Sequence, residues 1–471
     1  MIRAHTVAQV RTAEAALMAT VPPGTLMARA STGLAHACSR VLGRTYGATV
    51  LLLVGAGDNG ADALWAGAHL SRRGAQVTAA LLGEPVPGAL EAFLAAGGRV
   101  GEPGAADLVV DGLVGIGGRG ALRAGALALV RAAHGPVLAV DLPSGVDADT
   151  GAVQGEAVTA DVTVTFGTYK PGLLVGDGRR HAGRVELVDI GLAPYLPPAP
   201  VEALDAADLL LPRSPLDKYD RGVLGIAAGS PVYTGAAVLA VGAALAAGAG
   251  MVRFVGAAHP AEQVRRRWPE VVVTEACGAD VTSAGRVQAW VAGPGLGTGD
   301  EAERTVEAVL ASDLPVLIDA DALTICARHP GWLRDREAPT LLTPHDREYE
   351  RFGAPVGPDR IGAARRLAAQ LGVYVLLKGP ATVVAGPAGP VRINRTGTPA
   401  LAAAGSGDVL AGAGGALLAQ GLPVLEAASA AAYLHGRAGA LSCDGLATSA
   451  SRVVAAWPDA VRELLAARMG R

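Results

Sequence analysis

Residues 404–412 (AGSGDVLAG) combine the residue types that phosphoryl transfer to a hydroxyl group requires. A glycine-rich turn exposes backbone N–H groups at the start of a helix, where the helix dipole favours an anion. Asp408 would lie beside that anion. Because like charges repel, it suits a base for the attacking hydroxyl better than it suits a phosphate ligand. The alternative is that Asp408 only caps the helix and the glycines only pack, since short glycine motifs often match by accident.

Three polar side chains follow predicted strands in the N-terminal half of the chain. The apolar residues 48–54 lead to Asn59, residues 108–111 end in Asp111, and residues 137–141 are followed by Ser144. Parallel strands end at one edge of their sheet, so we expect these side chains to converge on a cation that accepts carbonyl and hydroxyl ligands. Each residue alone is better explained as a cap or turn residue, and their joint occurrence favours the site.

The glycine-rich segment 55–60 (GAGDNG) leaves a second interpretation open for this half. It fits the dinucleotide fingerprint G-x-G-x-x-G between a predicted strand and a predicted helix at residues 61–73. An NAD-dependent dehydrogenase is therefore a serious alternative, with Glu84 as the acid that binds ribose. Against it, Asp58, Asn59 and Asp62 crowd the turn where small residues would let a pyrophosphate approach, and two further acidic strand ends follow.

Further candidate residues follow predicted strands in the C-terminal half. Lys378 ends the apolar residues 373–378, and a lysine among apolar neighbours favours contact with a phosphate or another anion. Asp319, Asp321 and His345 also lie at strand ends or helix starts, where a cap or turn residue is a comparably good explanation. Residues 293–297 (GPGLG) offer backbone amides at a fourth strand end.

Length and composition set the frame for these motifs. A chain of 471 residues exceeds one ordinary core, so we expect two domains, and the proline-rich residues 194–200 mark the boundary. With 18% charged residues and a net charge of -3, no basic surface for nucleic acid or anionic lipid is expected. The uncharged residues 225–251 contain Ser, Pro, Tyr, Thr and many glycines, so they predict a strand, a loop and a buried helix rather than a membrane span.

Four dispersed cysteines without metal-binding spacing, and no apolar signal-peptide core near residue 1, predict a reduced cytoplasmic protein. Alternating strands and helices predict an α/β fold whose N-terminal domain is a doubly wound parallel sheet. We expect small-molecule partners, no nucleic acid, no membrane, and a homo-oligomer.

Three N-terminal motifs, GAGDNGADAL, DGLVGIGGRG and DLPSGVDADTG, resemble those of the NAD(P)H-hydrate epimerase family. The resemblance covers about residues 5–195 and implies a Rossmann-like domain, residues 1–204, that binds K+ and interconverts the R and S hydrates. It implies that Asn59, Asp111 and Ser144 bind K+. It further implies contacts with the hydrated nucleotide from Asp58, Asn59, Gly60, Ala61, Asp62, Gly115, Ile116, Gly117, Gly118, Arg119, Gly120, Ala121 and Asp141. Because loss and return of the hydroxyl need proton transfer, Asp141 is the catalytic candidate, with Asp147 as the alternative.

Five C-terminal motifs occur in the order of the ribokinase-like NAD(P)H-hydrate dehydratases: YTGAA, GPGLG, LTPHDREY, KGPAT and NRTGTPALAAAGSGDVLAG. This resemblance implies that residues 205–471 form a ribokinase-like α/β domain that uses ADP to dehydrate the S hydrate. It implies substrate contacts from Ala237, Gly297, His345 and the catalytic base Asp408, and nucleotide contacts from Lys378, Gly379, Pro380, Ala381, Thr382, Ser406 and Gly407. Mg2+ is expected on the phosphates on charge grounds.

The sequence therefore predicts a bifunctional repair enzyme that converts hydrated NADH and NADPH back to the reduced nucleotides, with AMP and phosphate as the products of ADP. Tandem fusion suits this chemistry, because the epimerase supplies the one epimer that the dehydratase accepts. The alternative is a ribokinase-like kinase for a small metabolite, joined to a non-catalytic nucleotide-binding domain. The two differ in the fate of phosphate, since a kinase releases a stable phosphoester.

Overall fold

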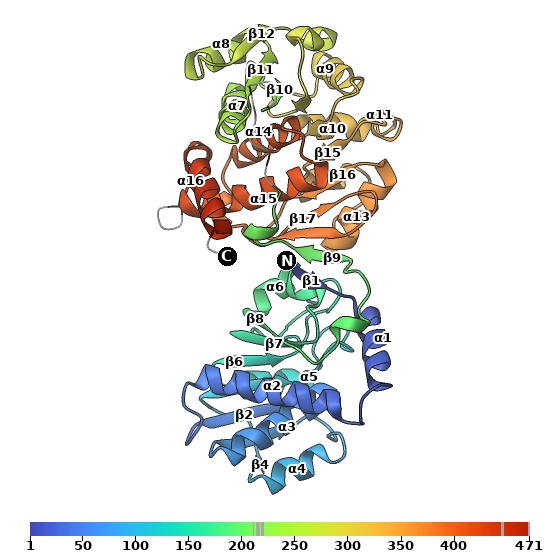
Figure 1. The fold of residues 1–471 in the computed structure, drawn as a ribbon, viewed down its shortest axis with the longest axis vertical. Coiled ribbons are helices and arrows are strands. Elements are labelled where there is room, and N and C mark those ends of the chain that lie inside the picture. Colours follow the sequence, from blue (N-terminus) through green and yellow to red (C-terminus); the bar gives the residue numbers. More distant parts are fainter. Residues whose placement is uncertain (211, 213–216, 218–220, 444–446, 470–471) are drawn as a thin grey trace. The chain divides into compact units, whose positions relative to one another are not determined.

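The computed structural model describes residues 1–210, 212, 217, 221–443 and 447–469. The chain folds into two compact units, Ile2–Val201 and Glu202–Arg471. Each unit has its own parallel or mostly parallel sheet with helices on both faces, as Figure 1 shows. The predicted α/β fold with two domains is confirmed. No described helix is both long enough and apolar enough to cross a membrane.

The N-terminal unit contains a seven-stranded sheet in the order β4-β3-β2-β5-β6-β7-β8, with all its pairs parallel. Its strands are β2 (Thr49–Val54), β3 (Gln76–Leu81), β4 (Arg99–Val100), β5 (Leu108–Gly112), β6 (Val137–Val140), β7 (Val162–Phe166) and β8 (Arg184–Val188). The chain winds outward from β2 in one direction and from β5 in the other, so the switch point lies between β2 and β5. Ligands bind at such switch points in open α/β sheets.

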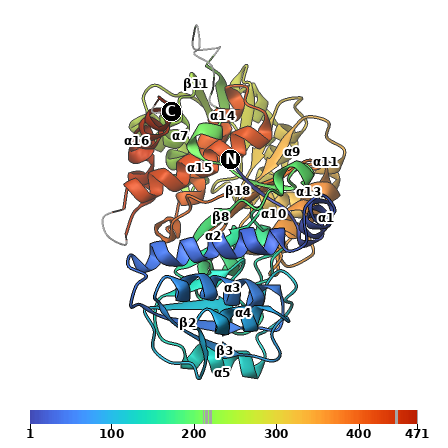
Figure 2. The ribbon, with the colours of Figure 1, turned by 60° about the horizontal axis from the view of Figure 1, so that its bottom comes forward.

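The helices of this unit cover both faces of the sheet because its strands are apolar on both sides. They are α1 (Val7–Met18), α2 (Thr25–Leu42), α3 (Asp58–Arg72), α4 (Ala89–Ala95), α5 (Ala124–Ala132) and α6 (Gly176–His181). Val50, Leu52 and Val54 pack in the core that contains α2 and α3, whereas Leu51 and Leu53 pack in the core that contains α5. Figure 2 shows α2, α3 and α4 together over this sheet.

The C-terminal unit has its strands in the order β9-β18-β17-β16-β15-β14-β13-β10-β11-β12. They are β9 (Val201–Ala203), β10 (Val223–Ala227), β11 (Met251–Gly256), β12 (Val272–Glu275), β13 (Ala289–Ala292), β14 (Val316–Ile318), β15 (Thr340–Leu342), β16 (Tyr374–Leu377), β17 (Thr382–Ala385) and β18 (Val391–Asn394). Strands β10 to β16 are all parallel, and β17 is antiparallel to both of its neighbours β16 and β18. The switch point lies between β10 and β13.

The register of the central strands aligns their carboxyl ends. Ala227 pairs with Ala292, Ala292 pairs with Ile318, and Ile318 pairs with Leu342. The residues that follow these strands therefore lie along one edge of the sheet. These residues include the GPGLG loop after β13, Asp319 after β14 and His345 after β15.

Two sets of helices flank this sheet. Helices α7 (Thr234–Ala246), α14 (Ser406–Ala419), α15 (Val424–Leu441) and α16 (Ala450–Met469) share one core with Leu224, Val291 and Leu317 of the strands. Helices α9 (Asp300–Leu310), α10 (Asp321–Arg328), α11 (Gly331–Arg334) and α13 (Arg360–Leu371) lie together in Figure 1, away from that core. The other two described α-helices of this unit are α8 (Ala258–Arg267) and α12 (Asp346–Glu350).

The uncharged segment 225–251 forms most of β10, the buried helix α7 and the start of β11, as predicted. One boundary differs from expectation near the N-terminal site. Helix α3 begins at Asp58 rather than at residue 61, so Asp58 and Asn59 belong to its first turn. A carboxylate in the first turn is favoured by the helix dipole, which explains the earlier start.

Candidate functional site

The carboxylate of Asp111 lies at the end of β5, beside the N-terminal switch point. Its Oδ1 accepts a hydrogen bond from Ser144 Oγ at 2.7 Å, and its Oδ2 accepts one from the Ser144 N–H at 2.8 Å. Asn59 Nδ2 donates to the Val140 carbonyl at 2.5 Å. The structure thus joins Asp111 to Ser144 directly and holds Asn59 at the end of the neighbouring strand β6.

Asp111 is fully buried, and the described part of the chain provides no ion pair for it. Burial raises the pKa of Asp111, although hydrogen bonds from Ser144 and Leu113 oppose this effect. A buried carboxylate is costly unless a cation or hydrogen bonds compensate its charge. Among the described residues no group of three or more His, Cys, Asp or Glu could hold a metal ion. A cation here would therefore need amide, hydroxyl or carbonyl oxygens as well, and those are the groups that surround Asp111.

Asp141 follows β6 and has a left-handed backbone, with φ of 66°. Its Oδ1 accepts three hydrogen bonds, from Lys170 Nζ at 2.5 Å, Thr165 Oγ1 at 3.0 Å and the Phe166 N–H at 3.2 Å. The Lys170 side chain is only 1% exposed and also donates to the Phe166 carbonyl at 3.0 Å. These bonds fix the orientation of the carboxylate through one oxygen.

Two further carboxyl groups interact electrostatically with Asp141. Burial first, and then the charges of Asp141, Asp58 and Glu14, raise the pKa of Asp62 well above its ordinary value. Burial likewise raises the pKa of Glu14 on α1, with Lys170 opposing the shift. Asp62 Oδ1 is buried without a hydrogen-bond partner in the described structure. The site therefore pairs a carboxylate held by a lysine with a buried carboxyl group that favours its protonated form.

The glycine-rich loop at residues 115–121 meets this site through its first residue. A Cβ atom at Gly115 would overlap Asn59 Oδ1, so only glycine leaves room for the amide in its observed position. Gly117 lies close to Arg11 of α1, with 3.3 Å between its ideal Cβ position and Arg11 Nη2. Arg119, Gly120 and Ala121 are exposed, further along the loop. Of the loop residues expected to contact the nucleotide, Gly115 therefore lies beside Asn59, whereas residues 119–121 are exposed.

Lys378 is the centre of the C-terminal site. Its Nζ lies 2.9 Å from Asp319 Oδ1 and 3.5 Å from Glu348 Oε2. Burial disfavours the charged lysine, but the two carboxylates outweigh burial, so the pKa of Lys378 lies above its ordinary value. Asp319 Oδ1 also accepts a hydrogen bond from Thr343 Oγ1 at 2.8 Å. A permanently charged ammonium group therefore stands at the ends of β14, β15 and β16.

Asp408 lies in the first turn of α14, within electrostatic reach of Lys378 and Asp319. Burial, followed by the negative charge of Asp319, raises the pKa of Asp408 to about 7, and Lys378 opposes the shift. Gly407, the residue before Asp408, lies close to the ammonium group: its ideal Cβ position is 3.5 Å from Lys378 Nζ. A carboxyl group that titrates near neutral pH is well matched to general base catalysis.

The backbone of the same turn provides N–H groups for an anion. Gly405 precedes the helix with φ of 84°, a left-handed conformation that glycine adopts without strain. The N–H groups of a first helical turn have no intrahelical acceptor. The Ser406 N–H instead donates to the Ala403 carbonyl at 3.2 Å, and Ser406 Oγ donates to the Leu401 carbonyl at 2.7 Å. The amides of Gly407 and Asp408 therefore remain as the best placed for an anion.

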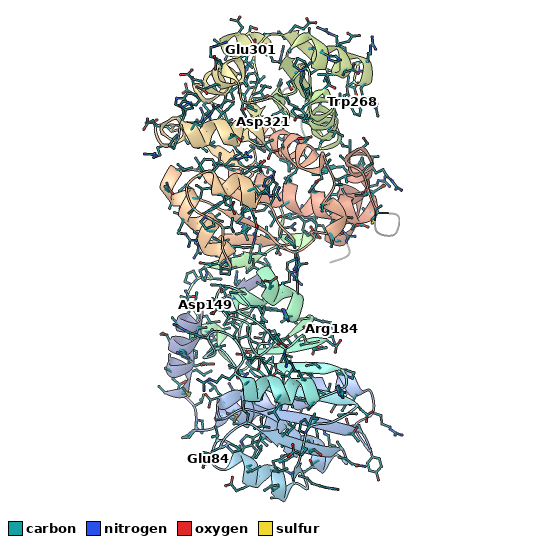
Figure 3. All side chains as sticks on the ribbon, turned by 180° about the vertical axis from the view of Figure 1, so that it is seen from behind. Glu84, Asp149, Arg184, Trp268, Glu301 and Asp321 are labelled. Atoms are coloured by element: carbon teal, nitrogen blue, oxygen red, sulfur yellow. The ribbon has the colours of Figure 1, made fainter. Side chains whose placement is uncertain are left out.

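The loops expected to contact the substrate surround Asp408. The Gly297 N–H donates to Asp321 Oδ2 at 2.8 Å, and the charge of Asp321 contributes to the raised pKa of Asp408. Figure 3 labels Asp321 in this part of the C-terminal unit. His345 caps α12 through reciprocal bonds with Glu348 and keeps half of its side chain exposed. Ala237, by contrast, is completely buried in α7, so it can affect the shape of the substrate site but offers no polar side-chain contact.

The KGPAT segment lies against a second basic residue. Arg360 Nη2 donates to the Lys378 carbonyl at 2.7 Å, and Arg360 Nη1 holds both oxygens of Asp346 at 2.8 and 2.9 Å. The ideal Cβ position of Gly379 is only 2.7 Å from Arg360 Nη2, so a side chain there would displace the guanidinium group. Sequence reasoning left out Arg360 because it lies on a helix far from any motif.

Four residues at these sites were absent from the predicted sets: Glu14, Lys170, Glu348 and Arg360. Lys170 had a detectable signal, because it is a lone lysine in the otherwise uncharged segment 162–175. Asp319 was a candidate because it follows a strand beside Asp321, but its contact with Lys378 was not predicted. Glu14 had no signal, because its place near Asp141 depends on how α1 packs.

The fold and these sites define a class: α/β proteins with a Rossmann-like and a ribokinase-like unit, each with charged groups beside the carboxyl ends of its parallel strands. Two family models match in this order, a YjeF-related protein N-terminus at residues 23–172 and an NAD(P)H-hydrate dehydratase at residues 224–454. A ribokinase-like superfamily protein from Enterococcus faecalis superposes with a TM-score of 0.51 and 25% identity, covering 56% of this chain and 96% of its own. The predicted ribokinase-like fold is confirmed.

Two similar proteins bear the name bifunctional NAD(P)H-hydrate repair enzyme. The Mycobacterium leprae protein is 51% identical over 434 residues, which is 89% of each chain. The Corynebacterium glutamicum protein is 38% identical over 463 residues, covering 79% of this chain and 78% of its own. The chain belongs to the family of bifunctional NAD(P)H-hydrate repair enzymes.

Proposed function

We propose that this chain repairs hydrated NADH and NADPH. The N-terminal unit interconverts the R and S hydrates, and the C-terminal unit dehydrates the S hydrate at the expense of ADP, giving AMP and phosphate. The observation that carries the proposal is Asp408, a carboxyl group with a pKa of about 7 beside a charged lysine and the start of a helix. The names of the similar enzymes support this choice of substrate.

In the dehydratase reaction, Asp408 takes the proton from the hydroxyl of the hydrated ring. The hydroxyl oxygen then forms a bond to the β-phosphorus of ADP while the bond from that phosphorus to AMP breaks. Lys378 and the Gly407 and Asp408 amides stabilise the charge that spreads over the phosphoryl oxygens. The phosphate then leaves the ring carbon as a proton leaves the adjacent carbon, and the double bond of the reduced nicotinamide returns.

The residues around Lys378 suit a magnesium ion that is held mainly by phosphates. Mg2+ in nucleotide sites keeps several waters and uses one or two protein carboxylates together with substrate phosphates. Asp319 and Glu348 are the nearby carboxylates, and both already face the Lys378 ammonium. Bound Mg2+ would neutralise phosphate charge. Lys378, Gly379, Pro380, Ala381, Thr382 and the Ser406–Gly407 turn would hold the nucleotide itself.

The pH dependence of the dehydratase should report Asp408. The base must be deprotonated to accept the hydroxyl proton, so its active fraction is lost as the pH falls through about 7. We expect kcat/KM for the S hydrate to fall about tenfold per pH unit below this value and to level off above it. Initial rates of NADH formation at saturating ADP measure the profile. A flat profile across pH 7 would contradict the role of Asp408.

Replacing the lysine tests the nucleotide site. Lys378→Met removes the ammonium and leaves Asp319 and Glu348 to repel phosphate, so we expect ADP to bind about 10- to 100-fold more weakly. Because Lys378 lowers the pKa of Asp408, the same variant should also move the pH profile upward. Calorimetric titration with ADP measures the first effect. Lys378→Arg is the matched control that keeps the charge, and equal ADP affinity in both variants would contradict the assignment.

For the epimerase, we propose that Asp141 is the base and Asp62 the neighbouring acid. Two carboxyl groups in different surroundings can serve as acid and base in one site. Lys170 holds the Asp141 carboxylate through Oδ1, which leaves Oδ2 for the substrate, while burial and the neighbouring carboxylates raise the pKa of Asp62. Asp58, Asn59, Gly60, Ala61 and the loop at residues 115–121 would bind the nucleotide around them.

A potassium ion fits beside these residues. Asn59, Asp111 and Ser144 would hold it with carbonyl oxygens of the adjoining loops, and it would compensate the buried charge of Asp111. When bound, K+ would supply a fixed positive charge beside the hydrated nucleotide. Glycine at position 115 supports this arrangement, because any side chain there would displace the Asn59 amide.

A further inference from the structure

Helix α1 lies against the N-terminal site, although none of its residues takes part in the proposed epimerase mechanism. Val10, Ala13 and Leu17 form its buried face and pack in the core that contains α2 and α3. At the start of the helix, the Val7 N–H donates to Asp149 Oδ1 at 2.8 Å, and Figure 3 labels Asp149. The helix is therefore anchored both to the core and to the loop that follows β6.

A second face of α1 is directed toward the residues of this site. Val7, Arg11 and Glu14 have the i, i+4, i+7 spacing of one helical face. Val7 and Ile116 both pack against the small core that contains Leu142. The same face of the helix therefore carries Arg11 and Glu14 beside the glycine-rich loop and the end of β6.

The two charged residues of this face lie near different parts of the site. Glu14 interacts electrostatically with Asp141, whereas Arg11 Nη2 is 3.3 Å from the ideal Cβ position of Gly117. Residues three apart on a helix have their Cβ atoms about 5–6 Å from each other. In a nicotinamide nucleotide, one ribose separates the ring from the first phosphate. A ring at Asp141 therefore places this phosphate close to Arg11.

The turn between Gly115 and Gly118 offers hydrogen-bond donors for that phosphate. The Gly118 N–H donates to the Gly115 carbonyl at 2.9 Å, which closes the turn. The N–H groups of Ile116 and Gly117 have no acceptor among the described residues. Arg11 likewise forms no hydrogen bond or ion pair with them, and both Arg11 and Gly117 are exposed. Unpaired N–H groups beside a guanidinium group are suited to bind an anion.

The charges around the turn make an added cation necessary for phosphate binding. Asp58, Asp141 and Glu14 would repel a phosphate group wherever they are ionised. The Lys170 ammonium cannot compensate them, because it is 1% exposed and already paired with Asp141. Arg11 is exposed, and a guanidinium group can donate two parallel hydrogen bonds to one phosphate.

We propose that Arg11 binds the phosphate next to the nicotinamide ribose of the hydrated nucleotide, which then lies between the guanidinium group and the turn at residues 115–118. The inference rests on the proposed epimerase function and adds a residue of α1 to its substrate site. Arg11 is here a binding residue, remote from the reacting carbon. Its loss weakens the binding of substrates that carry this phosphate and leaves the chemical step intact.

The test follows R-to-S conversion by the full chain without ADP. It compares NADH hydrate, the hydrate of reduced nicotinamide mononucleotide, and the hydrate of reduced nicotinamide riboside, which has no phosphate. Arg11→Gln should raise KM about tenfold for the first two substrates and leave kcat within about twofold, because a charge-assisted bond to phosphate is lost. The affinity for the riboside hydrate, measured as competitive inhibition where its turnover is slow, should stay unchanged.

Two variants serve as controls for this test. Arg11→Lys keeps the positive charge and should lose less affinity than Arg11→Gln. Arg99→Gln should behave as the parent enzyme, because Arg99 is an exposed arginine on β4, the edge strand of the same sheet.

The three substrates separate the possible outcomes. An equal loss of affinity for all of them in Arg11→Gln, or no loss for any, would overturn the role of Arg11. A loss confined to the dinucleotide would place the guanidinium group at the other phosphate and would overturn the position proposed here. If the parent enzyme converts no R hydrate, the proposed epimerase function fails together with the inference, whereas the other results leave that function intact.

Discussion

Asp408→Asn should reduce ADP-dependent dehydration about 10²- to 10⁴-fold, the range that a positioned general base contributes. The substitution keeps the shape of the side chain and the backbone N–H groups of α14, so ADP should bind with nearly unchanged affinity. A loss in kcat without a loss in ADP binding is the pattern expected when an interaction of the transition state is removed. The rate of NADH formation from the S hydrate measures the effect.

The same chain provides internal controls for this experiment. The epimerase activity of Asp408→Asn should equal that of the parent enzyme, because the N-terminal site belongs to a separate compact unit. Asp300→Asn is a matched control, since Asp300 is also an aspartate in the first turn of a helix, α9. Dehydration at the parent rate in Asp408→Asn would show that another group is the base.

Asp141→Asn should lower the enzymatic rate of epimerisation about 10²- to 10⁴-fold, toward the spontaneous rate, while dehydration of pure S hydrate continues. Asparagine tolerates the left-handed backbone at this position, so the change removes the charge without straining the turn. It also leaves Lys170 buried without its carboxylate partner. Chromatography that monitors the conversion of pure R hydrate to S hydrate measures the loss of epimerase activity.

Burying an unpaired lysine is itself costly, so stability must be measured beside activity. The double variant Asp141→Asn, Lys170→Met removes both charges and should restore the thermal unfolding temperature more than it restores activity. Recovery of epimerase activity in the double variant would contradict a catalytic role for Asp141 and would favour a purely structural ion pair.

The sequence identified functional residues at strand ends better than functional residues whose position depends on how the elements pack. Apolar runs followed by polar residues located the ends of β5 and β6 in one sheet and of β14 and β16 in the other, and parallel pairing aligned these ends along one edge of each sheet. That reasoning identified Asp111, Ser144 and Lys378. It could not identify the partners of Asp141, because β7 and its loop reach that carboxylate only after the sheet forms.

The acidic surroundings of Asp408 were likewise beyond prediction from sequence. Asp319 and Asp321 were visible at a strand end, but a cap explained them equally well in isolation. The position of Asp319 beside Lys378 follows from the order β16-β15-β14, which one sequence does not reveal. The pKa of about 7 at Asp408 therefore arises from tertiary structure, although the residue itself was identified from its loop.

The most direct test of the account follows both the reduced nucleotide and the phosphate produced from an R and S mixture of NADH hydrate by the purified chain with ADP and Mg2+. We expect the whole mixture to return to NADH, with one AMP and one inorganic phosphate for each NADH formed, and no reaction of ADP without hydrate. A stable phosphoester that accumulates without NADH would contradict the repair function and would instead identify a ribokinase-like kinase.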